Sequence, residues 1–376
     1  MKVDFAIVGA GIAGASLAWR LAEHSSVLLI EREAQPGYHS TGRSAAMFME
    51  SYGPPQARAL TRASRAFYTS PPPGFSDTPI LQPRGVLYLA RSGQQALLAQ
   101  HLKALAGSGV AVEQLDAAAT LERFPLARRE GLLGALFEPD AMDIDVHALH
   151  QGWLRGARRR GAELWLDAEL EAARFDAGRW RLQCAGARQA EARWLVNAAG
   201  AWADEVAADA GAAPLGLQPK RRSAFTFDPP AGLDCRRWPA VVGIDESWYL
   251  KPDAGQLLGS PANADPVAPH DVQAEEIDIA TGIAGIEAAT ELSIRRPRRV
   301  WAGLRTFAAD GELVIGAAPG VAQFFWLAGQ GGCGIQSAAG AAMLAEALVT
   351  GSALPEALRH ERIDPAAMSP GRLRRG

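Results

Sequence analysis

The first thirty-one residues alternate between short apolar runs and glycine-rich or polar breaks. Val3–Val8 is an apolar run typical of a buried strand, and the sequence Gly-Ala-Gly-Ile-Ala-Gly follows it at once. Ala15–Glu23 has helical composition, and Val27–Ile30 is a second apolar run that ends at Glu31. This order predicts a strand, a tight turn, a helix and a second strand, the start of a mainly parallel α/β sheet.

The rest of the chain predicts helices and strands in mixed order. Helical spacing of apolar residues, with Pro, Asp and Gly at the boundaries, predicts helices at 55–67, 94–105, 146–160 and 277–292, and an Ala-rich helix that ends near 348. Apolar or alternating runs predict strands at 85–90, 163–166, 170–175, 180–184, 194–196 and 324–327, with others inside 216–260. We further expect a hairpin around Asp310-Gly311 and a frayed tail from Ser369.

Composition restricts the class of protein. The 376 residues suggest one large or two medium domains, and 48% hydrophobic with 21% charged residues excludes a disordered chain. Lys plus Arg number 38 and Asp plus Glu 41, so the net charge is −3, which argues against a nucleic-acid binder. The three cysteines, Cys184, Cys235 and Cys333, form neither a disulfide framework nor a metal-binding pair. They favour a reducing compartment.

The apolar segment from Phe5 to Ala18 needs a separate test, because signal peptides are also apolar and N-terminal. Asp4 precedes it, glycines interrupt it, and no small-residue cleavage site follows. No later stretch reaches the ~18 uninterrupted apolar residues that span a bilayer. We therefore expect a cytoplasmic protein without a transmembrane segment.

The glycine-rich turn predicts a dinucleotide site. Gly9 suits the tight turn, Gly11 lets the backbone approach a pyrophosphate, and Gly14 lets the helix pack close to the sheet. The helix N-terminus offers free N–H groups and partial positive charge to phosphates. Glu31 follows the second strand, where a carboxylate accepts hydrogen bonds from a ribose diol.

A second sequence of the same form, Gly329–Gly334, also lies between a predicted strand and helix. No strand with a terminal acid follows it, so a separate NAD(P)H site is not expected. A helix N-terminus beside a flavin ring would stabilise the negative charge of the reduced ring. The chain therefore predicts FAD, with the substrate itself as the reductant.

Several motifs together resemble one family of flavoenzymes. They are Gly9–Gly14, Glu31-Arg32, Ser40–Ala46, Val196–Trp202, Gly303–Arg305 with Asp310-Gly311, and Gly331–Gln336. As a set they are similar to the D-amino acid oxidase/dehydrogenase family of FAD enzymes, and within it to the bacterial FAD-dependent D-arginine dehydrogenases. The resemblance covers almost the whole chain.

The resemblance implies both a fold and a reaction. The implied fold is α/β (α+β), with a Rossmann-like FAD-binding domain interleaved with a substrate domain on a large mixed sheet. The implied boundaries are 1–80, 143–218 and 303–376 for the FAD-binding domain and 81–142 and 219–302 for the substrate-binding domain. The implied reaction is oxidation of a D-amino acid by hydride transfer from Cα to flavin N5. The imino acid then hydrolyses to a 2-oxo acid and ammonia.

The resemblance also implies site residues. Those expected to bind FAD are Gly9, Gly11, Ile12, Ala13, Gly14, Glu31, Arg32, Thr41, Gly42, Arg43, Ser44, Ala45, Ala46, Ala199, Gly200, Trp202, Gly303, Gly331, Gly332, Gly334, Ile335 and Gln336. Those expected beside the substrate are Arg222, Arg305, Tyr249, Tyr52, Gly332, Gln336, Met47 and Met49. The arginines would hold the substrate carboxylate with paired charge-assisted hydrogen bonds.

The sequence departs from the arginine-oxidising relatives where those enzymes hold a basic side chain. The stretch after Ala46 reads Met47-Phe48-Met49-Glu50, and the strand Gly85–Tyr88 carries no acid. A cationic substrate side chain would then lack a partner. We expect a preference for neutral, apolar D-amino acids such as methionine, leucine or phenylalanine over D-arginine, unless Glu50 enters the pocket.

Other interpretations remain open at this point. The arginines would hold the carboxylate of an N-alkyl amino acid or a 2-hydroxy acid equally well, and a non-catalytic FAD-binding protein is a further alternative. The electron acceptor, a quinone or oxygen, is not encoded in any motif. His147 and His150, near Asp143 and Asp145, allow a metal site, but no third ligand stands out, so no metal is expected. Cys333 does not clearly match a position of covalent flavin attachment, so noncovalent FAD is expected.

Overall fold

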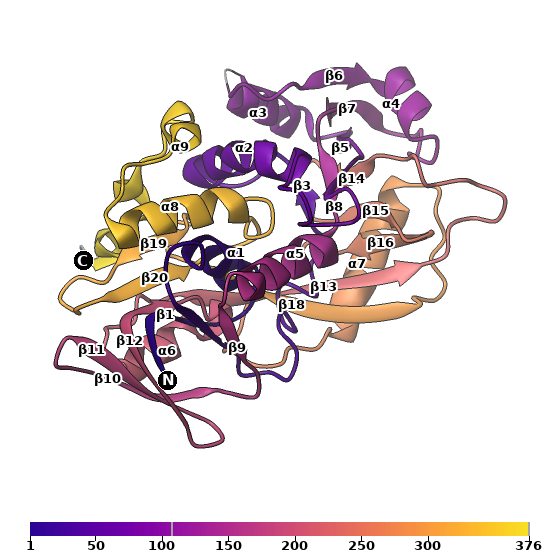
Figure 1. The fold of residues 1–376 in the computed structure, drawn as a ribbon. Helices are drawn as coiled ribbons and strands as arrows, with labels where there is room; N and C mark the ends of the chain where they lie inside the picture. Colours follow the sequence, from indigo (N-terminus) through magenta and orange to yellow (C-terminus); the bar gives the residue numbers. More distant parts are fainter. Residues whose placement is uncertain (107, 375–376) are drawn as a thin grey trace.

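The computed structural model describes residues 1–106 and 108–374, and in them two large mixed sheets and one small sheet lie side by side (Figure 1). The mixed α/β fold class predicted from the sequence is confirmed. In the same part of the chain, no helix combines the length and apolar character that crossing a membrane requires.

The first large sheet is built around the predicted N-terminal unit. β1 (Lys2–Val8) lies parallel to both β2 (Val27–Ile30) and β12 (Arg188–Asn197), and β12 is parallel to β20 (Phe324–Ala328). The remaining strands of this sheet are β9 (Glu163–Trp165), β10 (Leu170–Asp176), β11 (Arg179–Cys184) and β19 (Val314–Ala317). The strands of this sheet therefore come from both the N-terminal and the C-terminal parts of the chain.

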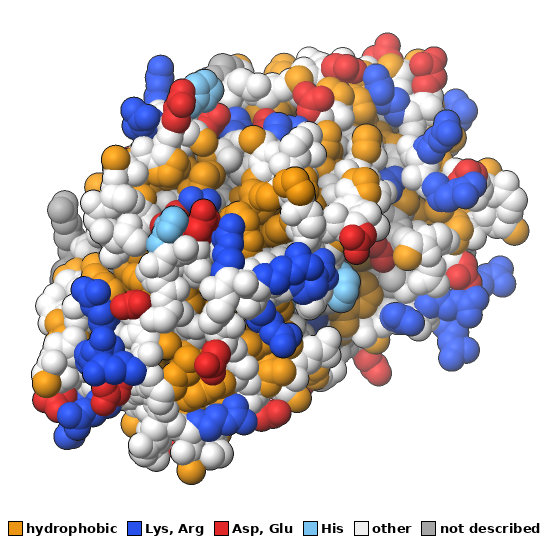
Figure 2. Space-filling model, in the orientation of Figure 1, with side chains coloured by type: hydrophobic (Ala, Val, Ile, Leu, Met, Phe, Trp, Pro, Cys, Tyr) orange, Lys and Arg blue, Asp and Glu red, His pale blue; other side chains and the backbone are white. Residues whose placement is uncertain are grey.

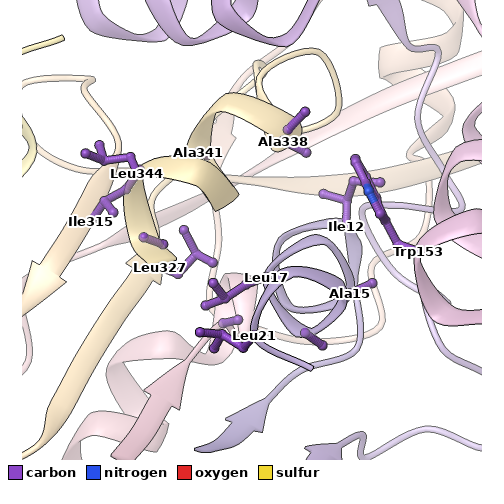
Figure 3. Packing of buried hydrophobic residues seen from close by; sticks show 14 of the residues in the cluster. Ile12, Ala15, Leu17, Leu21, Trp153, Ile315, Leu327, Ala338, Ala341 and Leu344 are labelled. Atoms are coloured by element: carbon purple, nitrogen blue, oxygen red, sulfur yellow. The ribbon is translucent and has the colours of Figure 1, made fainter. Parts of the chain in front are cut away.

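Apolar faces of three helices close over this sheet. α1 (Ile12–Leu21), α5 (Val146–Arg159) and α8 (Ala338–Thr350) meet in one buried cluster. Figure 3 shows Leu17 and Leu21 of α1 directed toward Leu327 of β20, with Leu344 of α8 and Ile315 of β19 nearby. The outer helices of this half are α2 (Pro55–Thr69), α6 (Ala203–Asp209) and α9 (Glu356–His360).

The second large sheet carries the other half of the molecule. Its longest pairing, at one edge of the sheet, is β13 (Gln218–Phe227) with β18 (Arg299–Phe307). Its other strands are β5 (Val86–Arg91), β6 (Glu113–Asp116), β7 (Leu132–Glu138), β14 (Ala240–Gly243), β15 (Tyr249–Asp253), β16 (Gln256–Ser260) and β17 (Asp265–Pro266). Its helices are α3 (Gln95–Leu105), α4 (Ala117–Arg123) and α7 (Glu276–Ala289). The division into two discontinuous domains stays a prediction, and β18 crosses its boundary at 303.

The small sheet joins the two halves. It consists of β3 (Met47–Phe48), β8 (Met142–Ile144) and β4 (Leu81–Pro83). β3 and β4 both lie antiparallel to β8. β8 leads directly into α5, whose N-cap Asp145 accepts a hydrogen bond from the Ala148 N–H at 2.8 Å, as the sequence predicted.

Two expectations about the C-terminal region are wrong. The strands on either side of Asp310-Gly311 do not form a hairpin, because β18 pairs with β13 while β19 pairs with β20. Residues 370–374 are also ordered, and residues 375–376 of the expected frayed tail lie outside the described part of the chain. Pro370–Arg374 forms a 3-10 helix, and the Arg372 guanidinium lies 2.7 Å from the Asp310 carboxylate. That ion pair and the packing of Pro370 on Gly316 fix the tail.

Candidate functional site

One long cavity runs between the two large sheets. Its walls come from the glycine turn, residues 30–32, most residues of 37–49, the loop after β12, four strands of the second sheet (β13, β14, β15 and β18), and the loop 330–336. Most residues predicted to bind FAD or substrate border it, although the chain brings them from several separate segments. Figure 2 shows basic and acidic side chains interspersed on the visible face of the molecule, as the small net charge of −3 suggests.

The glycine turn has the geometry that a pyrophosphate site requires. Gly9 has φ +100°, and a Cβ there would lie 2.4 Å from the Ala198 carbonyl oxygen. A Cβ on Gly14 would lie 1.9 Å from the Gly9 oxygen, so this glycine sets the close packing of α1 on the turn. α1 has no acidic residue in its first turn. The Ile12 N–H donates to Thr41 Oγ1 at 3.0 Å, which ties the residues 37–45 to this turn.

Glu31 lies at the end of β2 and borders the cavity. Its carboxylate is 8% exposed and accepts hydrogen bonds from the Ala10 N–H at 2.9 Å and the Glu33 N–H at 3.1 Å. Burial raises the pKa of this carboxyl, and the two N–H groups oppose the rise. Each oxygen has a second lone-pair direction, so the carboxylate can still accept a ribose hydroxyl.

Two further side chains, Arg32 and His150, make contacts close to Glu31 and the glycine turn, where the nucleotide is expected to bind. The Arg32 guanidinium lies 4.8 Å from the centre of the Trp202 ring, and both residues border the cavity. His150, buried in α5, has its Nε2 atom 2.8 Å from the Ala10 oxygen, and burial lowers its pKa. His150 therefore supports the glycine turn. Within the described residues no group of His, Cys, Asp and Glu side chains is placed to hold a metal ion.

The opposite end of the cavity holds two half-buried guanidinium groups. Arg222 Nε donates to the Asn263 carbonyl at 2.6 Å, and Arg305 Nη2 is 3.4 Å from the same oxygen. Burial and the charge of Arg305 lower the pKa of Arg222. Among the described residues, buried Arg305 Nε has no hydrogen-bond partner. Two cations that share one neutral acceptor form a site for an anion.

Tyrosine side chains border the arginine pair. The Tyr52 hydroxyl lies 3.4 Å from Arg305 Nη1, and the Tyr249 ring centre lies 5.9 Å from the Arg222 guanidinium carbon. Burial raises the pKa of Tyr52, so its hydroxyl stays protonated at neutral pH and can donate to an anion. A Cβ on Gly332 would lie 2.7 Å from the Tyr52 oxygen, so this position admits only glycine without a shift.

The wall around this end is largely apolar. Met47, Met49 and Val242 border the cavity and pack against a buried cluster. Glu50 does not border it, because its carboxylate pairs with Arg65 at 2.7 Å. Glu246 borders the cavity from an exposed turn.

A charged cluster missed by the sequence reasoning lies on the same wall. Lys251 is 6% exposed, borders the cavity and lies 2.7 Å from the Asp143 carboxylate. Arg84 contacts the same carboxylate at 2.6 Å. Two cations on one carboxylate leave a net positive charge beside the cavity. Lys251 lies two residues after Tyr249 on β15, so strand alternation from Tyr249 could have identified it.

The predicted site residues fall into two groups. Gly14 and Gly42 do not border the cavity. Each is instead required by close backbone packing, Gly42 because a Cβ would lie 2.7 Å from the Gly37 oxygen. All the others border it, among them Arg43, although Arg43 donates to the Val272 and Ala302 carbonyls and pairs with Asp271. Bordering residues that the sequence reasoning missed include Tyr88, Lys251, Glu246, His39 and Thr306.

The residues present fit FAD. The cavity extends without interruption from Glu31 past the glycine turn to the arginine pair, as an elongated dinucleotide joined to a ring system requires. At Gly9 a side chain would collide with backbone. The loop 330–336 reaches the cavity just before α8, which places backbone N–H groups near the ring end.

Comparisons with known proteins agree with this geometry. A protein-family model described as DAO, FAD dependent oxidoreductase, matches residues 4–348. Among curated proteins, glycine oxidase from Bacillus licheniformis is 28% identical over 208 residues, which are 54% of this chain and 55% of that protein. The match thus spans about half the length of this relative.

Solved structures share the fold. Glycine oxidase from Geobacillus kaustophilus has a TM-score of 0.85 and 23% identity, over 100% of this chain and 99% of that one. Iminodiacetate oxidase from Chelativorans sp. BNC1 has a TM-score of 0.79 and 22% identity, over 97% and 98% of the chains. L-proline dehydrogenase from P. horikoshii has a TM-score of 0.75 and 19% identity, over 96% and 98%. The family match confirms FAD as the cofactor, and the chain belongs to the DAO family of FAD dependent oxidoreductases.

Proposed function

We propose that this protein oxidises a neutral D-amino acid at Cα and yields an imino acid that hydrolyses to a 2-oxo acid and ammonia. The observation that supports the proposal is the pair Arg222 and Arg305, which lies at the end of the cavity formed with Tyr52 and the loop 330–336. Arg222 and Arg305 are half-buried, border the cavity and share the Asn263 carbonyl as acceptor, so their paired charges suit a small anion. A substrate carboxylate meets that requirement with parallel charge-assisted hydrogen bonds.

The side chains of the protein orient the substrate relative to the cofactor. FAD, when bound, would supply the acceptor for the hydride, which carries both electrons of the oxidation. The arginine pair grips one end of the substrate, and the Tyr52 and Tyr249 side chains limit its rotation, which fixes the direction of the Cα–H bond. The amine must be neutral when the hydride leaves, and no obligatory general base is proposed. The D configuration is supported by the resemblance of this constellation to the D-amino acid oxidase/dehydrogenase family.

The cavity wall supports a neutral substrate side chain. Met47, Met49 and Val242 offer apolar contacts, and the Lys251–Asp143–Arg84 cluster has excess positive charge that repels a cation. Glu50 is held away by Arg65. Glu246 lies on an exposed turn, where water weakens its attraction for a cationic side chain.

We also propose noncovalent FAD and a cytoplasmic location. Burial raises the pKa of the Cys333 thiol to about 12, which keeps it protonated and unreactive near the cavity. Quinone and oxygen stay alternatives for the electron acceptor.

A second candidate is an N-substituted amino acid. The arginine pair would hold the carboxylate of such a substrate equally well, and iminodiacetate oxidase is among the proteins with this fold. A 2-hydroxy acid satisfies the same carboxylate site.

Anaerobic reduction of the bound flavin tests these alternatives. The purified holoenzyme is mixed with D-methionine, D-phenylalanine, D-arginine, the L-enantiomers, glycine, sarcosine, iminodiacetate, lactate and NADPH, and flavin bleaching is followed. Fast bleaching by D-methionine and slower bleaching by D-arginine are expected. A much faster reaction with D-arginine overturns the neutral preference, and fastest bleaching by sarcosine, iminodiacetate or lactate selects another substrate class. No bleaching by any compound favours a non-catalytic flavoprotein. Admission of oxygen or a quinone then identifies the acceptor.

A further inference from the structure

The segment 49–52 is a short turn held at both ends by one side chain. Gln336, which is 3% exposed, accepts a hydrogen bond from the Met49 N–H at 3.1 Å and donates to the Tyr52 carbonyl at 3.2 Å. The Tyr52 N–H also donates to the Met49 carbonyl at 3.3 Å. Gln336 was predicted beside substrate and flavin, and its amide is engaged with this segment.

The middle of the segment is held from the other half of the molecule. Glu138 is the last residue of β7 and 1% exposed. Its Oε1 atom accepts from the Glu50 N–H at 3.0 Å, and its Oε2 atom accepts from the Ser51 hydroxyl. The Ser51 oxygen lies 3.1 Å from the Tyr88 hydroxyl, and Tyr88 borders the cavity. Both carboxylate oxygens of Glu138 therefore face the segment.

Burial of the Glu138 carboxylate lowers the stability of the fold unless its oxygens are hydrogen-bonded. Among the described residues, Glu138 has no ion-pair partner, and the nearby Arg65 pairs with Glu50 instead. Burial raises the pKa of the Glu138 carboxyl, and the donors from Glu50 and Ser51 oppose the rise. A buried carboxylate without a cation is unfavourable unless its hydrogen bonds are satisfied. Here the groups that satisfy it all come from the segment or contact it.

The segment ends in a residue of the proposed substrate site. Tyr52 places its hydroxyl 3.4 Å from Arg305 Nη1 and borders the cavity. Because Gln336 and Glu138 leave the segment little freedom, the Tyr52 side chain is held in place relative to the arginine pair. We propose that Glu138 is a positioning residue that fixes the 49–52 segment so that Tyr52 closes the carboxylate site. This inference rests on the proposed function, because it assigns Tyr52 to substrate binding.

The test compares Glu138→Ala with Glu138→Gln. In Glu138→Ala the segment loses both of its hydrogen bonds to Glu138 while Gln336 still holds its ends, so KM for the best amino acid should rise about 10-fold with a smaller change in kcat. In Glu138→Gln the amide oxygen still accepts from the Glu50 N–H, and the NH₂ group can donate to Ser51, so KM should stay within about 2-fold of wild type. If Glu138→Gln keeps the wild-type KM, the hydrogen bonds that hold the segment matter, and the negative charge of Glu138 does not.

Glu312→Ala is the matched control. The Glu312 carboxylate accepts from the Gln56 N–H at 2.8 Å, at the start of α2 and outside the 49–52 segment. Its loss should lower thermal stability and leave KM unchanged. If Glu138→Ala does not fold, Ser51→Ala replaces it, because that change removes one of the two hydrogen bonds between Glu138 and the segment and should give a smaller rise in KM.

Hydrogen–deuterium exchange of the holoenzyme without substrate provides an independent measurement. Amides in a peptide that covers 47–53 should exchange at least 10-fold faster in Glu138→Ala than in wild type or Glu138→Gln. Equal exchange in all three proteins, or an unchanged KM in Glu138→Ala, would overturn the positioning role even if amino acids reduce the flavin. If no amino acid reduces the flavin while exchange still increases, the proposed function fails and Glu138 holds the segment for another ligand.

Discussion

Two like charges at the end of a cavity define the chemistry of the site at the scale of single residues. Arg222 and Arg305 share one carbonyl acceptor, and burial lowers the pKa of Arg222. Such a pair raises the free energy of the protein until an anion arrives, so part of the affinity for a carboxylate comes from relief of this repulsion.

Removal of one guanidinium should therefore weaken substrate binding strongly. For Arg305→Met we expect KM for the amino acid to rise about 100-fold or more, because a buried charge-assisted contact is lost. The flavin content should stay at wild-type level. The control is Arg221→Met, since Arg221 contacts Asp265, Glu275 and Asp278 and does not border the cavity. This variant should melt at a lower temperature with unchanged KM; steady-state kinetics and thermal melting distinguish the two effects.

The raised pKa values of the cysteine thiols predict how fast these thiols react at a given pH. Burial raises the pKa of Cys333 to about 12 and that of Cys184 to about 11, and Cys235 is also buried with a raised pKa. A raised thiol pKa means that the neutral form persists to higher pH, so the reactive thiolate is scarce at pH 8. Ellman's reagent should detect three thiols in the denatured chain and react only slowly with the native holoenzyme. Fast native modification at pH 8 would contradict this.

At the scale of elements, two glycines of the same turn have different roles: Gly14 is required for backbone packing, and Gly11 is expected to be required for cofactor binding. A Cβ on Gly14 would collide with the Gly9 oxygen, whereas a Cβ on Gly11 would meet only Thr41 Oγ1, at 3.3 Å. Gly14→Ala should therefore destabilise the protein by ~2 kcal/mol with or without FAD.

Gly11→Ala should behave differently. We expect apoprotein melting close to wild type and a clear loss of FAD affinity, because the proposed role of Gly11 is close approach of the backbone to the pyrophosphate. Thermal melting of the apoprotein and flavin titration measure the two quantities. Equal losses of stability in both variants would show that both glycines serve only packing.

Elements with local signals could be predicted from the sequence, and long-range pairings could not. The helix after Asp145 was predicted because an N-cap and an apolar stripe lie within one short stretch. The hairpin at Asp310-Gly311 was wrong because β18 gains a long antiparallel pairing with β13, whose paired residues lie 73 (Thr226 to Arg299) to 89 (Gln218 to Phe307) positions earlier in the chain. Lys251, Tyr88 and Glu138 were missed for the same reason, since their importance depends on partners distant in sequence.

At the scale of the whole molecule, Arg43 connects the two halves. It comes from the segment that also contacts the glycine turn, yet its guanidinium donates to the Val272 and Ala302 carbonyls and pairs with Asp271. The Arg43 carbonyl in turn accepts from Trp301 Nε1 at 3.0 Å.

Arg43→Ala should consequently affect stability and cofactor retention together. We expect a loss of ~2 kcal/mol from the charged hydrogen bonds, with weaker FAD binding as the halves loosen. Arg298→Ala, which removes an ion pair with Asp228 between exposed side chains, is the control and should leave the melting temperature unchanged. Unfolding curves with and without added FAD provide the measurement. A loss of FAD affinity without loss of apoprotein stability would assign Arg43 to the cofactor alone.

The strand order of the first sheet also determines when the protein can fold during synthesis. β1 lies between β2 and β12, and β12 pairs on its other edge with β20, which ends at Ala328. β1 meets β12 only after 189 further residues have been made (Lys2 to Glu191), and β20 on the far side of β12 begins 316 residues after β1 ends at Val8. Because unpaired strand edges aggregate, we expect fragments that end before β20 to be insoluble, which expression of a chain truncated after β12 would show.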